Sequence, residues 1–402
     1  MEGASGRFDV VVVGGGPAGA TAATDLAARG LRVALLDRGG RIKPCGGAVP
    51  PALLREFDVP TSLLVDRIDT ARIRSPRGQA VDIPIRDGFV GMVDRETFDE
   101  WLRDRAERRG ATRVQGSFEG LERDGDGDLR VRFARPGDAR RGGPSTLRTR
   151  LVIGADGATS LVARRAIPGA ERAGGRVFAY HEIVRAPDAA DPDAFLPGRA
   201  EVAYDERLSP DFYGWVFPHG DTISVGVGSA QSGFGMRDAV SLLRQRSGLA
   251  TCETIRREGA PIPMRARRRW DNGRDVLVVG DAAGVVAPSS GEGIYYAMAS
   301  ARIGAEAAAE ALATGRAAAL RRARRRFMRA HGPVFLALGV MQRFWYRDDG
   351  RRERFVAICR DPDVQRLTFD GYMNKQLVRS QPITHARIFL KNVGHLTGWV
   401  PA

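Results

Sequence analysis

Short apolar runs that end at glycine recur along the chain. The run Val10–Val13 ends at Gly14, and two later runs of the same kind end at Gly154 and Gly280. Uninterrupted β-branched runs of this length are typical of strands buried on both faces of a parallel sheet. The pattern predicts an α/β domain whose sheet is assembled from three separated stretches of the chain.

The first run opens a β-α-β unit. Ala18–Arg29 consists mostly of good helix formers and ends at Gly30, a residue that often terminates helices. Leu31–Leu36 is a second apolar strand that ends at Asp37. We expect a parallel strand pair with a right-handed helical crossover.

The middle of the chain has a different pattern. Segments near Ala71–Ile85 and from about Arg176 to Arg265 alternate apolar and polar residues, which predicts mostly antiparallel strands. A charged amphipathic helix is expected at Arg95–Arg109, and a meander at Glu122–Ser145 with a loose hairpin tip around 137–144. Tyr295–Ala313 is an alanine-rich helix candidate.

These elements predict a discontinuous first domain of residues 1–70, 93–168 and 265–325. The antiparallel strands take 71–92 and 169–264, and a helical region takes 326–402. Around the start of that last region, seven arginines from Arg316 to Arg329 precede the apolar, aromatic stretch Pro333–Tyr346. Such a pair of segments suits either an anionic bilayer surface or a solvated helix followed by a core helix.

Composition narrows the function classes. The 402 residues carry a formal net charge of +14, which invites nucleic-acid and anionic-membrane interpretations. Only three of the 62 basic residues are lysines, so codon preference explains much of the excess, and we expect no nucleic acid as partner.

Cys45, Cys252 and Cys359 lie far apart, which predicts neither disulfides nor zinc, and the five histidines show no spacing for a metal. No apolar stretch is long enough to span a membrane.

The segment after the first strand fits G-x-G-x-x-G. Gly14 permits a tight turn, Gly16 lets the backbone approach a pyrophosphate, and Gly19 lets helix and strand pack closely. The helix N-terminus offers amides to phosphates, and Asp37 suits a ribose hydroxyl. The candidate dinucleotide-binding residues are Gly14, Gly16, Pro17, Ala18, Gly19, Asp37 and Arg38.

Two further strands end in a glycine-flanked aspartate. Gly154-Ala155-Asp156-Gly157 and Gly280-Asp281-Ala282-Ala283 resemble, in this order, motifs of the flavoprotein superfamily that includes aromatic hydroxylases and geranylgeranyl reductases. The resemblance implies a Rossmann-type FAD-binding domain with an antiparallel substrate domain. It also implies cofactor contacts by Arg95, Asp156, Gly280, Asp281, Pro288, Gly291 and Gly293. A helix N-cap role for the two aspartates is compatible with this assignment.

Other segments resemble the geranylgeranyl reductases in particular. Lys43-Pro-Cys-Gly-Gly-Ala-Val-Pro50 is similar to the segment that places a cysteine and two glycines beside their flavin, here Cys45, Gly46 and Gly47. Tyr213-Gly-Trp-Val-Phe-Pro218 matches a motif that lines their prenyl cavity, here Tyr213, Trp215, Phe217 and Pro218. On a strand the three aromatic residues share one face, which also suits an ordinary sheet core. Tyr372–Arg379 and Ile388–Gly398 are similar to the ending of the bacteriochlorophyll branch.

The resemblance implies an FAD-dependent reductase that saturates three double bonds of the geranylgeranyl group of (bacterio)chlorophyll, or of geranylgeranyl diphosphate, to give phytyl. NADPH is the implied transient reductant, because no second G-x-G-x-x-G is present; reduced ferredoxin stays open. The expected catalytic residues are Cys45, Tyr213 and Trp215. An unperturbed thiol is mostly protonated at neutral pH, so Cys45 is either the proton donor or a structural residue beside the flavin.

Other functions stay open at this point. An aromatic hydroxylase on the same scaffold, a reductase of another prenyl lipid and a non-catalytic pigment-binding protein are the alternatives. We expect a cytoplasmic protein attached peripherally to a photosynthetic membrane, with a prenylated pigment as substrate. The sequence does not distinguish the free diphosphate from the esterified pigment as substrate, and it leaves the oligomeric state undetermined.

Overall fold

The computed structural model describes residues 7–40, 42–86, 88–125, 127–135, 144–172, 175–191, 193–366 and 375. The chain divides into two compact units, each assembled from separated stretches. Unit 1 comprises Met1–Lys43, Glu96–Arg176 and Pro261–Gly332, and unit 2 comprises Pro44–Arg95, Val177–Ala260 and Pro333–Ala402. The expected hairpin tip around 137–144 lies almost wholly outside the described residues, as do the C-terminal segments 372–379 and 388–398 apart from Lys375.

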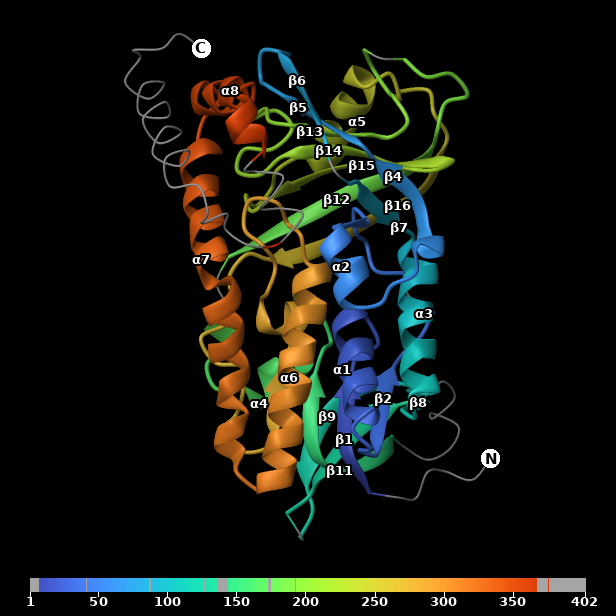
Figure 1. Cartoon of the computed structure of the whole chain (residues 1–402), viewed down its shortest axis with the longest axis vertical. Helices are drawn as coiled ribbons and strands as arrows, with labels where there is room; N and C mark the ends of the chain where they lie inside the picture. Colours follow the sequence, from blue (N-terminus) through green and yellow to red (C-terminus); the bar gives the residue numbers. More distant parts are fainter. Residues whose placement is uncertain are drawn as a thin grey trace. The chain divides into compact units, whose positions relative to one another are not determined.

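Unit 1 contains a seven-stranded mixed sheet. Its parallel strands are β1 (Phe8–Val13), β2 (Val33–Asp37), β8 (Thr112–Gln115), β11 (Ser145–Gly154) and β17 (Val276–Val278), and its antiparallel ones are β9 (Ser117–Arg123) and β10 (Leu129–Ala134). The order is β8-β2-β1-β11-β10-β9, with β17 pairing β11. Figure 1 labels β1, β2, β8, β9 and β11 of this sheet. Residues 10–13 are almost fully buried, as expected for an apolar central strand.

Helices α1 (Pro17–Ala27), α4 (Leu161–Ala166) and α6 (Ile294–Thr314) pack on strands of this sheet. Unit 1 also contains α3 (Arg95–Arg108) and the first half of α7 (Arg321–Trp345). Helices α1 and α6 pack against each other, and α1 follows β1 directly, so the N-terminus of α1 lies at the carboxyl end of the central strand. That position is where open α/β sheets bind ligands.

Unit 2 contains a second seven-stranded sheet, in the order β16-β12-β15-β14-β13-β5-β6. The strands are β5 (Thr70–Arg74), β6 (Ala80–Pro84), β12 (Arg176–Arg185), β13 (Arg199–Ala203), β14 (Gly214–His219), β15 (Thr222–Ser229) and β16 (Thr254–Pro263). The pairs β12–β15, β13–β14, β14–β15 and β5–β6 are antiparallel, and β13 pairs with β5 in parallel. A small sheet adds β3 (Ala48–Val49), β4 (Leu64–Ile68) and β7 (Val90–Val93).

The two faces of the larger unit 2 sheet differ. One face packs on helix α5 (Met236–Arg246) through a core that includes Val216, Val225 and Leu243. The opposite face carries the alternate residues of the same strands, among them Trp215 and Phe217. Phe217 packs with residues of the small sheet such as Met92. Helices α2 (Pro51–Glu56) and α8 (Asp349–Ile358) complete the unit.

The mixed α/β fold expected from the sequence is confirmed, and one helix differs from expectation. The basic and apolar C-terminal segments form a single helix, α7, which continues through Pro333, whereas one of the two interpretations left open expected two helices. A proline removes one backbone hydrogen bond from a helix, and here the helical conformation continues past it. Within the described ranges, no helix combines the length and the hydrophobicity that crossing a bilayer requires.

Candidate functional site

The turn between β1 and α1 has no room for side chains at two of its glycines. Gly14 has a φ of +103°, and a Cβ there would lie 2.4 Å from the carbonyl oxygen of Ala155. A Cβ on Gly19 would lie 1.7 Å from the carbonyl oxygen of Gly14. Both glycines are therefore required by the packing of the loop itself.

Gly16 differs from its neighbours, because a Cβ on it would meet nothing within 4 Å. Gly16 is the N-cap of α1, no side chain caps this helix, and its first turn holds no acidic residue. The first-turn amides lack intrahelical partners, and the helix dipole adds positive potential there. Open space beside uncapped amides fits the pyrophosphate of a dinucleotide.

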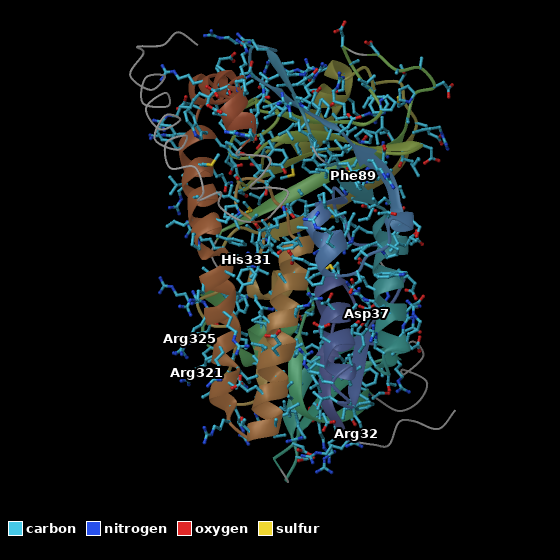
Figure 2. All side chains as sticks on the ribbon, viewed as in Figure 1. Arg32, Asp37, Phe89, Arg321, Arg325 and His331 are labelled. Carbon is cyan, nitrogen blue, oxygen red and sulfur yellow. The ribbon has the colours of Figure 1, made fainter. Side chains whose placement is uncertain are left out.

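Asp37 lies at the end of β2 and holds this loop. One carboxylate oxygen accepts a hydrogen bond from the Gly15 amide at 2.7 Å, and the other accepts one from the Gly39 amide at 2.8 Å. Arg103 of α3 donates to the Gly15 carbonyl at 3.2 Å. Figure 2 labels Asp37 beside the helices of unit 1. The neighbouring Arg38 side chain is exposed, and Arg95 is a buried residue at the start of α3.

The carboxylate of Asp156 binds the N-terminal end of helix α4. It accepts hydrogen bonds from the Ser160 hydroxyl at 2.5 Å and from the amides of Leu161 and Val162 at 2.7 and 3.0 Å. Burial raises the pKa of Asp156, against the lowering effect of these hydrogen bonds. The N-cap residue of α4 is Ser160 and not Asp156, but the Asp156 carboxylate still binds free amides of the first turn of this helix.

Asp281 forms an ion pair with Lys43. The Lys43 ammonium lies 2.5 Å from the carboxylate, whose side chain is only 10% exposed. Gly280, with a φ of +62°, precedes it, and a Cβ there would lie 2.7 Å from the Cβ of Ala18 in α1. The Gly280-Asp281 turn and the N-terminus of α1 are thus adjacent within unit 1.

The loop before α6 has an unusual backbone. Ser289 has a φ of +65°, a left-handed conformation that non-glycine residues rarely adopt, and Gly291 has a φ of +67°. Residue 293 is the N-cap of α6, and no side chain caps that helix either. A second long helix of unit 1 therefore offers uncapped amides, and the strain at Ser289 is of the kind that concentrates at ligand sites.

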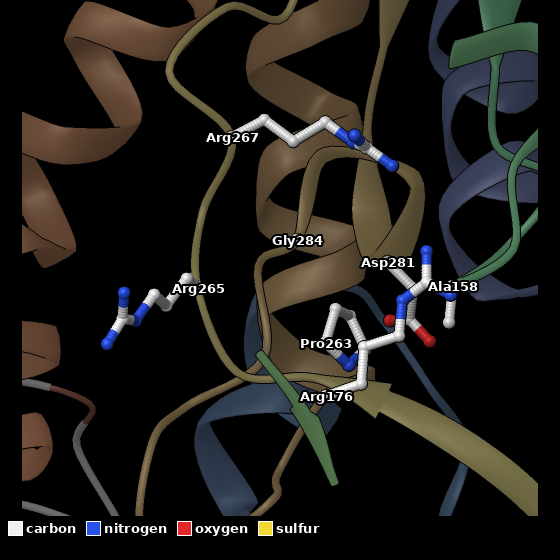
Figure 3. Close-up of a pocket in the computed structure, with 7 residues that line it drawn as sticks. All are labelled: Ala158, Arg176, Pro263, Arg265, Arg267, Asp281 and Gly284. Carbon is white, nitrogen blue, oxygen red and sulfur yellow. The ribbon is translucent and has the colours of Figure 1, made fainter. Parts of the chain in front are cut away.

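A small pocket adjoins Asp281 (Figure 3). It is lined by Ala158, Arg176, Pro263, Arg265, Arg267, Asp281 and Gly284. Arg267 donates to the carbonyls of Ala282 and Ala170 at 2.6 and 2.7 Å, and burial lowers its pKa, as does the positive charge of Arg176. Figure 3 shows that the side chain of Arg265 points away from Asp281. The positive charge on this wall suits an anionic group.

In unit 2, Cys45 lies in a tight turn against β14. Its free, half-buried thiol accepts a hydrogen bond from the Gly47 amide at 3.4 Å. A Cβ on Gly46 would lie 3.1 Å from the Phe217 ring, and one on Gly47 would lie 2.5 Å from Nε2 of His219. Glycines are therefore needed for this turn to pack on the strand.

The aromatic residues of the Tyr213–Pro218 motif form a row. The ring centroids of Tyr213 and Trp215 are 6.1 Å apart, and those of Trp215 and Phe217 are 6.3 Å apart. Tyr213 and Trp215 are buried, and so is Pro218, which by the period of two faces the other side of the strand. Such a row is an apolar, π-rich wall that suits a hydrocarbon chain and can stabilise nearby positive charge.

Two residues near these positions were not singled out from the sequence. Lys43 was noted only as part of a motif, although it is one of three lysines in an arginine-rich chain. His219 continues the aromatic face by the same period of two, and its Nδ1 lies 3.0 Å from the Phe217 carbonyl oxygen. Burial lowers the pKa of His219, which favours the neutral ring at neutral pH.

Comparisons with known proteins agree with this geometry. Residues 67–328 match the family described as FAD binding domain, and residues 9–48 match the family described as FAD dependent oxidoreductase. A geranylgeranyl diphosphate reductase of Rhodobacter capsulatus is 55% identical over 98% of this chain and 99% of its own. A chloroplastic geranylgeranyl diphosphate reductase of Oryza sativa subsp. japonica is 38% identical over 97% of this chain and 86% of its own.

A solved structure shares the fold. The crystal structure of a geranylgeranyl bacteriochlorophyll reductase-like protein from Thermoplasma acidophilum superposes with a TM-score of 0.77 at 19% identity, over 94% of this chain and 99% of that one. At that identity the likeness concerns the fold alone. The extent and identity of the sequence matches show more: this chain belongs to the geranylgeranyl reductase family, and it contains that family's FAD-binding domain.

Proposed function

We propose that this protein is an FAD-dependent reductase that saturates three double bonds of a geranylgeranyl group to give phytyl, in (bacterio)chlorophyll biosynthesis. The observation that carries the proposal is the 55% identity to a geranylgeranyl diphosphate reductase over nearly the full length of both chains. The aromatic row beside the Cys45 turn supports the assignment, because a hydrocarbon substrate requires an apolar wall.

The residues of unit 1 fit FAD. Gly14, Gly16, Pro17, Ala18 and Gly19 would hold the pyrophosphate, and Asp37 with Arg38 would hold the adenosine end. The family resemblance assigns the flavin end to Asp156, Gly280, Asp281, Pro288, Gly291 and Gly293 of unit 1. It also assigns it to Cys45, Gly46, Gly47 and Arg95, which belong to unit 2. For Asp156 the hydrogen bonds to α4 support an indirect role, in which the carboxylate fixes the loop that carries Gly157.

FAD, when bound and reduced by the external donor, would supply the hydride that is added to one carbon of each double bond. A prenyl alkene is unactivated, so hydride addition alone would leave negative charge on an alkyl carbon. A proton must therefore reach the other carbon first or at the same time. Cys45 would donate this proton from Sγ to the less substituted carbon and then regain one from solvent. The faces of Tyr213 and Trp215 would stabilise the positive charge that develops on the tertiary carbon, and Phe217 would extend the apolar wall.

The reductant in this proposal is NADPH, which visits the flavin transiently. The cationic pocket with Arg176 and Arg267 supports binding of a phosphate-bearing reductant near the FAD domain. Reduced ferredoxin is the alternative donor. We also propose that the protein works in the cytoplasm, attached peripherally to a photosynthetic membrane in which the pigment substrate is held.

The test is anaerobic incubation of the FAD-loaded protein with NADPH and, in separate reactions, geranylgeranyl pigment and geranylgeranyl diphosphate. Mass spectrometry should find six added hydrogens in the preferred substrate. A hydroxylase would need oxygen and would add an oxygen atom. A protein that is purified without flavin and that binds none would be a pigment carrier, which would overturn the proposal. A parallel reaction with reduced ferredoxin in place of NADPH identifies the donor.

A further inference from the structure

A line of polar side chains runs through the buried sheet of unit 2 and ends at Trp215. The indole Nε1–H of Trp215 donates to the Ser224 hydroxyl at 3.1 Å. The same hydroxyl lies 2.9 Å from Nδ1 of His181, and Nε2 of His181 lies 3.1 Å from a carboxylate oxygen of Glu258. We call Ser224, His181 and Glu258 the Trp215 support.

Strand register brings the support together. Each member comes from a different strand, β15, β12 and β16, and Trp215 comes from β14. Gly226 of β15 is paired with Trp215 on one side and with His181 on the other. A Cβ on Gly226 would lie 2.3 Å from the indole and 2.5 Å from the Cβ of His181. The glycine thus leaves space for the two rings, whose centroids are 6.1 Å apart.

The proton positions follow from what each group can do. An indole N–H only donates and a carboxylate only accepts, so Nε2 of His181 carries the proton that faces Glu258 and Nδ1 accepts from the Ser224 hydroxyl. Arg256 lies 2.6 Å from the second oxygen of Glu258. Burial raises the pKa of Glu258, but His181 and Arg256 outweigh it and leave the pKa below its ordinary value. The approach of Nε2 to Glu258 is oblique, so that contact is mainly electrostatic.

Burial of these side chains restricts the orientation of the Trp215 ring. Ser224 is fully buried, His181 is 2% exposed and Trp215 is 5% exposed, so none of their polar atoms can turn to water instead. A buried donor that loses its partner carries a desolvation penalty. The indole N–H of Trp215 therefore favours the one ring orientation that reaches Ser224, which apolar packing alone would not select.

We propose that Ser224, His181 and Glu258 are positioning residues that fix the ring plane of Trp215 and thereby determine how far a prenyl chain advances along the aromatic row. The inference rests on the proposed function. A hydrocarbon chain offers no hydrogen bonds, so the shape of its wall decides which double bond is held for reaction. A wall whose central ring is free to turn would hold each successive double bond less accurately, and partly reduced chains would leave early.

The principal variant is Ser224→Ala, which removes the hydroxyl and little volume. We expect FAD content to stay near that of the wild type and the melting temperature to fall by a few degrees, because the buried indole N–H loses its partner. We expect kcat for full reduction to fall about tenfold with KM within about twofold, because lost positioning acts on the reacting geometry more than on binding. Products with two or four added hydrogens should increase severalfold. His181→Gln tests the next member of the support.

Tyr180→Phe is the matched control. It also removes one hydroxyl from β12, but that hydroxyl bonds Glu182 and lies on the opposite face of the strand. We expect its product distribution to equal that of the wild type. If Ser224→Ala gives the wild-type distribution as well, the proposal is wrong.

A double-mutant cycle separates positioning from a general effect on the fold. If Ser224 acts through Trp215, then Ser224→Ala should have no further effect in a Trp215→Phe background. An undiminished effect there would overturn the inference.

A spectroscopic readout is independent of turnover. The fluorescence of Trp215, taken as the difference between wild type and Trp215→Phe, should shift in Ser224→Ala and not in Tyr180→Phe. An unshifted spectrum contradicts the inference even if the protein is an active reductase. Wild-type protein that is loaded with FAD and reduces no geranylgeranyl substrate would instead contradict the proposed function, while the shift would still support fixation of the ring.

Discussion

Lys43 and Asp281, 238 positions apart in the chain, form an ion pair of 2.5 Å within unit 1. By family resemblance Asp281 lies near the ribityl or pyrophosphate part of FAD, where an unpaired carboxylate would repel the phosphates. We expect Lys43→Met to weaken FAD binding roughly tenfold, which corresponds to about 1.4 kcal/mol. The dissociation constant, measured by quenching of flavin fluorescence on addition to apoprotein, checks this.

The matched control for Lys43 is Arg326→Met, which removes a cation from an exposed ion pair with Glu306 in the same unit. Exposed pairs contribute little, so FAD affinity should not change. If both variants bind FAD as the wild type does, the Lys43 pair has no role in cofactor binding.

Gly19 and Gly16 should respond differently to the same substitution. Gly19→Ala places a Cβ 1.7 Å from a backbone oxygen, so we expect apoprotein stability to fall by about 1–3 kcal/mol or more. Gly16→Ala meets no protein atom and has an ordinary φ of −75°, so stability should change by less than about 1 kcal/mol while FAD binding weakens. Thermal unfolding of the apoproteins and FAD titration distinguish the two. Equal FAD affinity of Gly16→Ala and wild type would mean that the pyrophosphate does not approach this residue.

The sequence was informative where local patterns determine structure. The run Val10–Val13 predicted the central strand because a buried parallel strand must be apolar on both faces. Gly14 and Gly19 predicted the tight turn between β1 and α1 because only glycine fits there. Tyr213 and Trp215 share a face because the period of a strand is two. Each of these inferences needs residues within one or two neighbouring elements.

Relationships between distant strands could not be read in the same way. The approach of His181 to Ser224 depends on the register between β12 and β15, which nothing in either strand's sequence specifies. The pairing of Lys43 with Asp281 depends on where a glycine-rich segment without regular structure lies. The continuation of α7 through Pro333 goes against the local preference of proline to end a helix, so this segment alone does not predict it.

Asp205 anchors the loop that leads into the aromatic row. Burial raises the pKa of Asp205, but hydrogen bonds from Arg207 and Arg246 outweigh it and hold the pKa at about 2. A carboxyl with a lowered pKa stabilises the fold above its unfolded-state pKa of about 3.9, and that contribution is lost as pH falls toward about 2. The contribution is about 2 kcal/mol at neutral pH.

Asp205→Asn should therefore lower the free energy of unfolding of unit 2 at pH 6, and the difference from wild type should shrink between about pH 4 and pH 2. Denaturant titrations across this range measure it. Asp188→Asn, at an exposed position, is the control. A difference that stays constant with pH would show that the loss comes from packing and not from the charge of Asp205.

Cys45→Ala should retain FAD and lose reduction about 100-fold or more in kcat, because a positioned general acid contributes that much. Cys45→Ser should recover part of it through its hydroxyl. Turnover in deuterated water, followed by mass spectrometry, counts the protons that solvent supplies. Cys252→Ala is the matched control, since it removes another half-buried thiol of unit 2. Full turnover by Cys45→Ala with an unchanged solvent label would assign the proton to another group.

Helix α7 carries the surface that we expect to bind membrane. Leu336 and Val340 are 71% and 59% exposed one turn apart, and by the helical period Arg325 and Arg329 share their face. Figure 2 shows Arg325 on the side of α7 away from α6. Apolar residues next to arginines suit the headgroup region of an anionic bilayer, where each arginine contributes about 1 kcal/mol.

Cosedimentation with vesicles of anionic lipid should therefore decrease when salt is added. Arg325→Gln with Arg329→Gln should weaken binding by about 2 kcal/mol, roughly 30-fold, and make it less sensitive to salt. Leu336→Ser with Val340→Ser should weaken it without changing the salt dependence, because apolar burial is not screened. Arg322→Gln with Arg326→Gln is the control, since those side chains pair with Glu310 and Glu306 of α6. Equal binding to neutral vesicles would show that the +14 charge has no part in membrane attachment.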